Sequence, residues 1–292
     1  MTKCALLSHT IWAMTLLLVP TTSYSKPLHR WKQSTPQHKR SSLQKRFRPP
    51  RGFVRTKASK RSFLWWMRRL PIQPRGSAVY YFDGRKKPSQ SHHVGVIDLD
   101  IGRRDLQQCA DAVMRVWSEY LWYRGLQRYT SFNFLDGSPN PWKHWQRGLR
   151  PMFRRRRAPR WSKRRRSDKT YKNYRRYMRF VMAYSNTTSL EHQLKKIKCR
   201  SARAGDILLV GWRQGQPGHA ILLLDEATNK RGKKVFLLAQ SYMPAQSFHV
   251  LKAPGQSTSP WYAFPKRGKI KTPEWTFNTK QCYRLPLTRY HR

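Results

Sequence analysis

One cysteine, one histidine and one glutamine stand in an order that would support nucleophilic catalysis. Cys109 opens an apolar helical pattern, where the free backbone N–H groups of a first turn favour a thiolate. His219 follows a glycine at the start of an apolar strand, and Gln240 closes the next strand. In such an arrangement the sulfur attacks an amide carbonyl, the imidazole moves the proton and the glutamine orients the imidazole. We therefore take Cys109, His219 and Gln240 as candidate catalytic residues.

The neighbours of Cys109 have opposite effects on the pKa of its thiol. Arg103 and Arg104 favour a thiolate, whereas Asp111 would raise the thiol pKa if it faced the sulfur. Asp111 is alternatively a partner for Arg115, its i+4 neighbour. A lone helical cysteine is also commonly packed as a small apolar side chain. The sequence leaves the catalytic and the packed interpretations of Cys109 both open.

Two glutamines and several histidines are further candidates. Gln107 or Gln108 could donate an amide N–H to an oxyanion. A metal site would have to draw on His92, His93, His144, His219 and His249. Adjacent strand residues point to opposite faces, so the first two do not easily ligate one ion. We predict no metal site and no cofactor.

A helix and a hairpin must position these residues. Apolar residues at three- and four-residue spacing predict a helix over 106–124, with Asp105 as N-cap. Strand patterns over 219–225 and 235–240 flank a polar turn, which predicts a β-hairpin. A turn centred between positions 229 and 230 would place His219 opposite Gln240, and a register one or two residues off is equally allowed. Further expected elements are a short helix at 63–70, strands at 79–82, 93–99 and 207–211, and a helix at 189–198.

The charge balance indicates anionic surroundings. The chain has 292 residues, with 61 Lys and Arg against 13 Asp and Glu, a formal net charge of +48. Its hydrophobic content of 38% excludes a wholly disordered chain, and its mean hydropathy of −0.81 excludes a multi-span membrane protein.

Two strongly basic segments stand out. Residues 26–61 contain no acid, and we predict a disordered basic arm. Residues of about 146–179 read as a basic insertion into a single domain over 62–285. Aromatic residues interleave both segments, which suits an anionic polymer, although a solvated charge run that binds nothing is an equal alternative. The candidate polyanion-binding residues are Arg154, Arg155, Arg156, Arg157, Arg164, Arg165 and Arg166.

The N-terminus and the cysteines indicate the compartment. Residues 1–25 combine a positive start, an apolar run and small residues before Lys26, typical of a signal peptide, although a single anchor helix is the alternative. We therefore expect an exported chain, periplasmic or extracellular, with no span after cleavage and a short tail at 286–292. Of the remaining cysteines, Cys199 and Cys282 are the favoured disulfide pair, with all three reduced as the alternative.

Several ordered motifs resemble a bacterial family of unknown function made of exported or lipid-anchored proteins. The segments that carry the resemblance are DLQQCADAVMR from Asp105, PGHA from Pro217, LAQSYMPAQ from Leu238 and TPEW from Thr272. The resemblance covers about residues 62–285 and implies membership and export, but it implies no activity.

The Cys–His–Gln order is separately similar to papain-like cell-wall cysteine peptidases and amidases. The predicted fold class is α+β, an antiparallel sheet with a packed central helix, and the comparison implies a papain-like arrangement. The predicted function is a cysteine-dependent peptidase or amidase of the cell envelope acting on a peptide substrate. The alternative is a non-enzymatic basic binder of an anionic polymer such as lipopolysaccharide, teichoic acid or nucleic acid.

Overall fold

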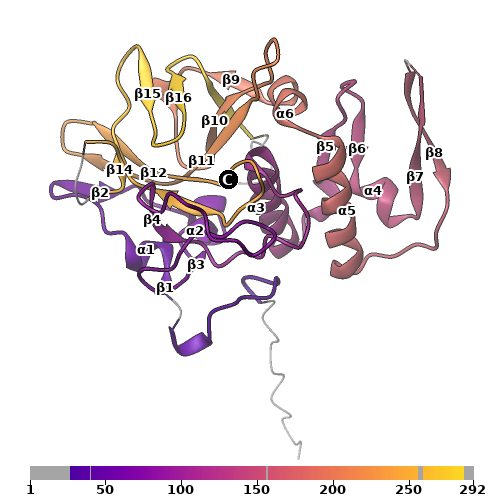
Figure 1. Ribbon diagram of the computed structural model, residues 1–292, viewed down its shortest axis with the longest axis horizontal. Helices are drawn as coiled ribbons and strands as arrows, with labels where there is room; N and C mark the ends of the chain where they lie inside the picture. Colours follow the sequence, from indigo (N-terminus) through magenta and orange to yellow (C-terminus); the bar gives the residue numbers. More distant parts are fainter. Residues whose placement is uncertain (1–26, 40, 156, 256–258, 286–292) are drawn as a thin grey trace, which may run out of the picture.

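The computed structural model describes residues 27–39, 41–155, 157–255 and 259–285. The predicted signal peptide over 1–25 and the predicted tail over 286–292 lie outside the described residues. The described chain is an α+β protein in which helices cover an antiparallel sheet, as predicted (Figure 1). Within it, no helix combines the length and the apolar character needed to cross a membrane.

A nine-stranded antiparallel sheet forms the centre of the described molecule. Its main path runs β4-β13-β12-β11-β10-β17-β9, while β14 pairs with β12 and β2 pairs with β11. Its strands are β2 (Phe53–Arg55), β4 (His93–Val96), β9 (Lys195–Ile197), β10 (Asp206–Val210), β11 (His219–Asn229), β12 (Lys234–Gln240), β13 (His249–Leu251), β14 (Trp261–Tyr262) and β17 (Cys282–Arg284). Both faces are buried, which explains why the central strands read as continuous apolar runs.

The β11–β12 hairpin is present, but its register differs from the one predicted. Leu222 pairs with Ala239, a shift of two residues, and a bulge between Leu223 and Asp225 adds one more. Continuing the register places Gln240 opposite Ile221, so His219 is its diagonal neighbour on the same face. The hairpin turn is therefore centred closer to β12 than the sequence suggested.

Two long helices lie in layers on one side of the sheet. α3 (Cys109–Tyr123) packs against β11, and α5 (Tyr171–Tyr184) packs on α3 (Figure 1). The predicted helix start at 106 is wrong by three residues. Gln108 is the N-cap, because the Asp105 carboxylate instead accepts the backbone N–H of Ala245 at 2.7 Å. The shorter helices are α1 (Leu43–Arg46), α2 (Phe63–Met67), α4 (Trp142–Gln146) and α6 (Thr187–Gln193), with 3-10 turns η1 (Gln37–Lys39), η2 (Gln127–Tyr129) and η3 (Cys199–Ser201).

The prediction of a disordered arm over 26–61 is wrong for the part that the structure describes. Trp31 and Leu43 belong to the hydrophobic core, and Trp31 Nε1 donates to the Asp98 carbonyl at 2.6 Å. Arg55 pairs with Asp225 at 2.7 Å across 170 positions of the chain. The composition of the arm did not indicate this packing. The apolar surface that it contacts, and the acids that pair with its basic residues, come from distant segments of the chain.

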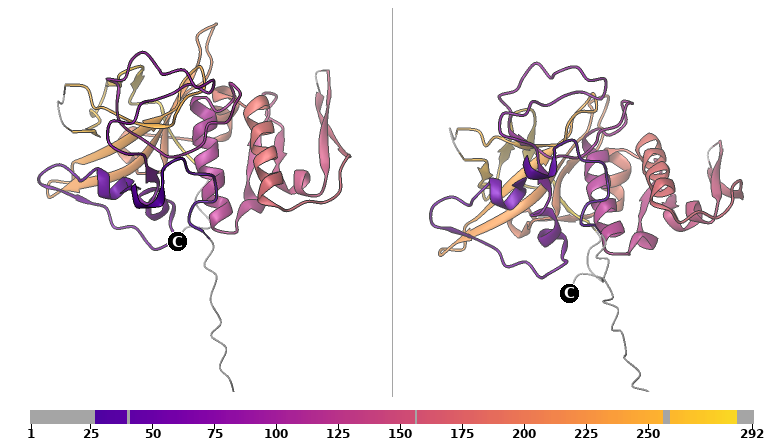
Figure 2. Two further views of the ribbon diagram at one scale, coloured as in Figure 1. Left: turned by 60° about the horizontal axis from the view of Figure 1, so that its bottom comes forward. Right: turned by 90° about the horizontal axis from the view of Figure 1, so that it is seen from below.

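The predicted insertion over 146–179 divides into two parts with different structures. β7 (Leu149–Arg154) and β8 (Arg157–Lys163) form a hairpin at the end of the molecule farthest from the sheet (Figures 1 and 2). α5 is core rather than insertion, because Tyr174, Tyr177 and Met178 are buried. The buried residues of α5 recur at three- and four-residue spacing, as in an amphipathic helix, but the charge of the segment led to its interpretation as an insertion.

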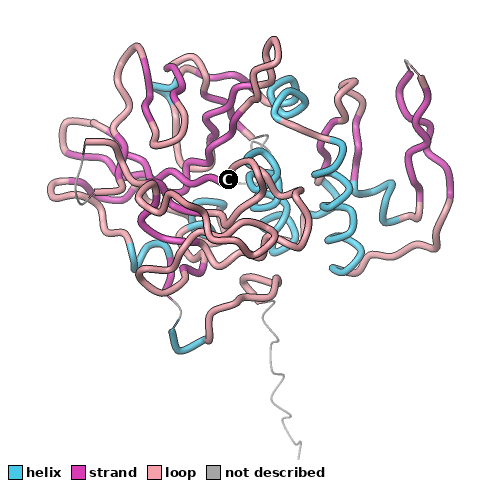
Figure 3. Tube along the Cα trace, viewed as in Figure 1, coloured by secondary structure: helices cyan, strands magenta, loops and turns pink. Residues whose placement is uncertain are grey.

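Small two-stranded sheets complete the fold (Figure 3). Their strands are β1 (Ser41–Ser42), β3 (Pro71–Ile72), β5 (Ser131–Asn133), β6 (Pro139–Pro141), β15 (Lys269–Lys271) and β16 (Thr276–Asn278). The expected helix at 189–198 is wrong beyond 193, where β9 follows, and the expected strand at 79–82 is reduced to isolated bridges. Cys199 and Cys282 form the predicted disulfide.

Candidate active site

The first turn of α3 meets the first residues of β11. Cys109 is the N1 residue of α3 and is 3% exposed, and its sulfur lies against the backbone N–H of Ala220. Ala220 directly follows His219 in the chain. The fold therefore brings the two predicted residues to one place, although they are far apart in sequence.

The His219 side chain lies on the far face of the sheet from α3. Ala220 and Leu222 pack toward α3, whereas Ile221 and Leu223 belong to a second cluster that includes Phe277 of β16. Strand alternation places His219 with this second set, and its ring centroid lies 5.9 Å from that of Phe277. The sulfur contacts the Ala220 backbone and interacts with Tyr242, whose ring also borders the imidazole, so both groups lie near the start of β11.

A chain of hydrogen bonds fixes the imidazole. His219 Nε2 lies 2.8 Å from Gln240 Oε1, and Gln240 Nε2 donates to Glu274 Oε2 at 2.6 Å. The other oxygen of Glu274 pairs with Lys87. Because an amide oxygen only accepts, Nε2 carries the ring proton and Nδ1 keeps its lone pair. Among the described residues, the buried Nδ1 atom has no hydrogen-bond partner, so it is available as a base.

Aromatic rings enclose His219. The ring centroids of Tyr242 and Trp275 lie 4.8 and 5.1 Å from that of the imidazole. The charge on Cys109 contributes to a raised pKa of the Tyr242 phenol, after burial and Glu274, so this phenol lies near both the sulfur and the imidazole. Sequence reasoning did not single out Tyr242, Glu274 or Lys87. Tyr242 and Glu274 belong to the LAQSYMPAQ and TPEW motifs, and Glu274 is a rare acid in a basic chain.

Burial holds both candidate catalytic groups neutral. It raises the pKa of the Cys109 thiol to about 12, with Asp111 adding in the same direction, while nearby backbone N–H groups oppose this. Burial also lowers the pKa of His219 to about 4, against the opposing effects of Gln240 and Glu274. The expectation of a thiolate favoured by the helix N-terminus and by arginines is therefore wrong for this enclosed state. The cost of placing a charge away from water exceeds the effect of the helix dipole.

A family model covers most of the chain. Residues 43–284 match the family described as "Domain of unknown function (4846)". The chain belongs to this family. The match begins within the predicted arm and runs through the predicted insertion, in agreement with the packing of α1 and α5. Neither the curated proteins nor the solved structures contain a match to this chain.

The two glutamines proposed for an oxyanion hole differ in whether their amide N–H groups are engaged. Gln108 donates its amide to Asp105 at 2.9 Å. Gln107 Oε1 accepts from Arg115 at 3.0 Å, and its side chain lines a separate cavity of about 210 Å³ beside Arg175, but its buried Nε2 has no partner among the described residues. The backbone N–H groups of the first turn of α3 lie near the sulfur and are further candidates.

Asp111 does not pair with Arg115 as the spacing suggested. Its carboxylate instead accepts the backbone N–H of Gln108 at 3.1 Å, which caps α3. Arg115 pairs with Glu119 at 2.7 Å and with Asp100 at 2.9 Å. Asp111 therefore faces the start of the helix and the sulfur, and burial raises its own pKa.

The basic residues and the histidines occupy other places. Arg154, Arg155 and Arg157 are exposed on the β7–β8 hairpin, Arg164, Arg165 and Arg166 are exposed at its base, and Arg156 lies outside the described residues. Among the described residues no group of three or more His, Cys, Asp or Glu could hold a metal ion. A cavity of about 650 Å³ lies beside the hairpin, and Cys109 is not among its lining residues.

Proposed function

We propose that this protein is a cysteine-dependent peptidase or amidase. The observation that carries the proposal is the oriented imidazole: Gln240 holds His219 Nε2 at 2.8 Å, Nδ1 has no described hydrogen-bond partner, and Tyr242 borders the imidazole and interacts with Cys109. A packed cysteine would not require a polar chain of four buried or half-buried groups from His219 to Lys87. Such a chain is expensive to bury and is typical of a site where a base must be oriented.

The reaction follows the general scheme of thiol hydrolases. Nδ1 of His219 takes the thiol proton as the Cys109 sulfur attacks the amide carbonyl carbon. The oxyanion accepts hydrogen bonds from the backbone N–H groups at the start of α3 and from the Tyr242 hydroxyl. The C–N bond breaks as Nδ1 returns the proton to the leaving amine, which leaves a thioester. A water molecule, deprotonated by the same nitrogen, attacks the thioester, releases the acid and restores the thiol.

The neutral thiol and imidazole fit a general-base mechanism rather than a preformed ion pair. Substrate has to displace part of the aromatic cover, because Cys109 and His219 are 3% and 0% exposed. Trp275 and Tyr242 are only partly buried and make up that cover. We infer that they move when the substrate enters.

The proposed place of action is the cell envelope. The predicted signal peptide and the Cys199–Cys282 disulfide both favour an oxidising compartment. Envelope peptides that contain amide cross-links are substrates of the matching chemical class. A binder of anionic polymer is the second candidate, favoured by the exposed arginines of the hairpin.

The test combines a substrate assay with a substrate-like electrophile. The purified chain is incubated with isolated peptidoglycan and, separately, with a peptidyl acyloxymethyl ketone that alkylates activated cysteines. We expect release of new amines and a mass adduct on Cys109, with Cys109→Ala losing at least about 10³-fold in rate. His219→Ala should lose both readouts, whereas His144→Gln, a change at a histidine on α4, should lose neither. Equal labelling of the wild type and His219→Ala would contradict the proposal.

A further inference from the structure

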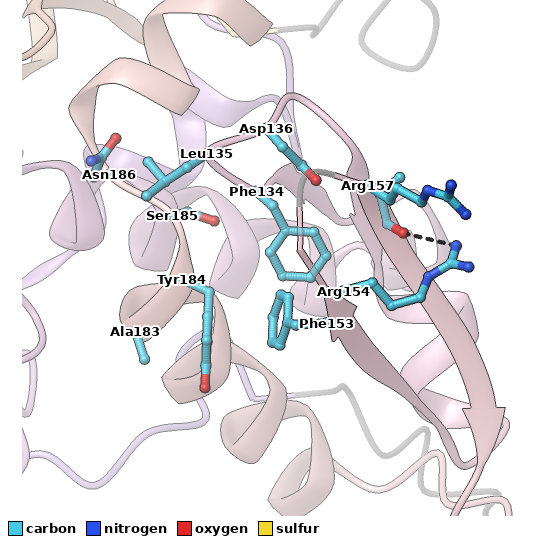
Figure 4. Close-up of a pocket in the computed structure, with 11 residues that line it drawn as sticks. Phe134, Leu135, Asp136, Phe153, Arg154, Arg157, Ala183, Tyr184, Ser185 and Asn186 are labelled. Carbon is cyan, nitrogen blue, oxygen red and sulfur yellow. Dashed lines mark hydrogen bonds between the residues drawn. The ribbon is translucent and has the colours of Figure 1, made fainter.

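A cavity lies between the β7–β8 hairpin, the end of α5 and the loop at 134–136. Its volume is about 650 Å³, and its walls come from three segments that are separate in the sequence (Figure 4). We call this cavity the hairpin groove. Its lining residues are Phe134, Leu135, Asp136, Phe153, Arg154, Arg157, Ala158, Ala183, Tyr184, Ser185 and Asn186.

Two of the three aromatic rings in the hairpin groove, Phe153 and Tyr184, are open to solvent, whereas Phe134 is buried. Phe153 and Tyr184 stack with centroids 4.9 Å apart and an interplanar angle of 18°, and Phe134 meets Phe153 edge-on at 5.4 Å. Phe153 and Tyr184 are nevertheless 51% and 43% exposed, beside Leu135 at 62%. Neighbouring exposed rings of this kind are typical of surfaces that bind a flat or apolar group.

The charge at the hairpin groove is positive. Arg154 and Arg157 lie side by side at its rim, and Arg154 Nη2 donates to the Ala158 carbonyl at 3.3 Å (Figure 4). Residues 149–163 contain no Asp or Glu. Asp136 is the one acid in the lining described, and its carboxylate already accepts from the Ser138 N–H and hydroxyl at 2.9 and 2.6 Å. An anionic ligand therefore fits the groove.

The remaining polar groups restrict which anionic ligand fits. The Asn186 amide oxygen caps α6 through Thr188 N–H at 2.9 Å, and the Ser185 hydroxyl donates to the Asn133 carbonyl at 2.9 Å. Few side chains are left to bind the many hydroxyls of a glycan. A concave site also fits a flat bilayer surface poorly. Aromatic faces beside guanidinium groups instead suit bases that stack and phosphates that pair.

We propose that the hairpin groove binds single-stranded nucleic acid. A base stacks on the ring pair of Phe153 and Tyr184, and adjacent phosphates contact Arg154 and Arg157. This binding site is separate from Cys109, and it does not depend on the proposed hydrolase activity.

The test uses the full chain and a fluorescein-labelled oligothymidylate of twenty nucleotides. We expect Phe153→Leu, which keeps an apolar side chain but removes the ring, to weaken binding about tenfold. The double variant Arg154→Gln with Arg157→Gln should lower the slope of log affinity against log salt by about 1.4. The matched control, Arg160→Gln with Arg166→Gln, removes the same charge from exposed residues outside the groove and should leave the Phe153 effect intact.

Three results would overturn the proposal. They are an unchanged affinity in Phe153→Leu, equal losses in the two arginine double variants, and oligonucleotide binding that heparin or vesicles of 30% phosphatidylglycerol outcompete at equal charge concentration. The first two would indicate diffuse polycation binding, and the third a sugar or lipid ligand. Thermal unfolding of each variant distinguishes lost binding from lost fold.

Discussion

The Cys109–His219 site buries neutral groups, whereas the hairpin groove exposes charged ones. At the first turn of α3, burial raises one pKa to about 12 and lowers the other to about 4, so the site is closed and neutral. In the hairpin groove, Arg154 and Arg157 are exposed, as are Phe153 and Tyr184, although these two rings contact each other. The reactivity of a buried polar site depends on pH and on the loss of single hydrogen-bonding groups. Ligand affinity at an exposed basic groove depends on the salt concentration.

The pH dependence of thiol alkylation is expected to give the largest effect. With a pKa near 12, the thiolate fraction of Cys109 should rise about tenfold per pH unit, so labelling by iodoacetamide should increase about 10³-fold from pH 6 to pH 9. Mass spectrometry of the labelled peptide measures the rate. A rate that is flat over this range would indicate a preformed thiolate and would contradict the neutral site.

Acid should destabilise the fold through His219. Its folded pKa of about 4 lies below its ordinary value of 6.5, so the unfolded state binds more protons and stability falls as pH decreases from 6.5 to 4. The expected loss is about 3 kcal/mol by pH 4. Urea unfolding at pH 7 and pH 4 measures this loss in the free energy of unfolding. In His219→Gln the loss should be smaller than in the wild type by that amount. His249, whose pKa is also lowered to about 3, contributes equally to both proteins. An unchanged difference between the two pH values would show that His219 is not held neutral.

The bond between Gln240 and His219 can be tested with two buried glutamines. Gln240→Leu frees Nε2 and leaves Glu274 without its amide donor, and we expect kcat/KM to fall about 100-fold. Gln246→Leu is the matched control, because the Gln246 amide is buried without a described partner and should leave activity unchanged. A pH–rate profile that shifts only in Gln240→Leu would assign the effect to the imidazole. Equal losses in the two variants would indicate general damage to the core.

Salt should weaken binding at the hairpin groove but leave the Cys109 site nearly unchanged. This difference is the smallest of the expected effects. Two phosphate contacts predict that affinity for the oligonucleotide falls about sevenfold between 50 and 200 mM NaCl. Labelling of Cys109 by a neutral reagent should change less than about twofold over the same range, because its pKa is set by burial. Parallel titrations of both readouts in one sample provide the comparison. A salt response shared by the two would mean that the groove and the catalytic site are coupled.

The sequence predicted most of what depends on local periodicity. Helix 106–124, the β11–β12 hairpin, the short helix at 63 and the α+β class all follow from apolar spacing and turn residues. The Cys199–Cys282 pair was favoured correctly from its setting in basic loops. The turn is centred closer to β12 than predicted, and the two-residue shift at Leu222 and Ala239 lies within the range that the turn left open.

Predictions based on the local charge of a segment were wrong in two places. The arm at 26–61 was predicted to be disordered and the segment of helix α5 to be a basic insertion, yet Trp31, Leu43 and Tyr174 are buried. Their arginines are matched by acids that lie far along the chain, such as Asp225 for Arg55 and Asp100 for Arg175. Pairing over such distances cannot be read from composition.

The sequence by itself determined which residues could do chemistry and in what order, because a nucleophile, a base and an amide mark the ends of strong periodic patterns. The tertiary structure alone decided their protonation states and their partners. A pKa depends on the water and charge that surround a group in space. For Cys109 those surroundings include the distant Ala220 and Tyr242 beside the nearby Asp111, and for His219 they include Gln240, Glu274 and Lys87.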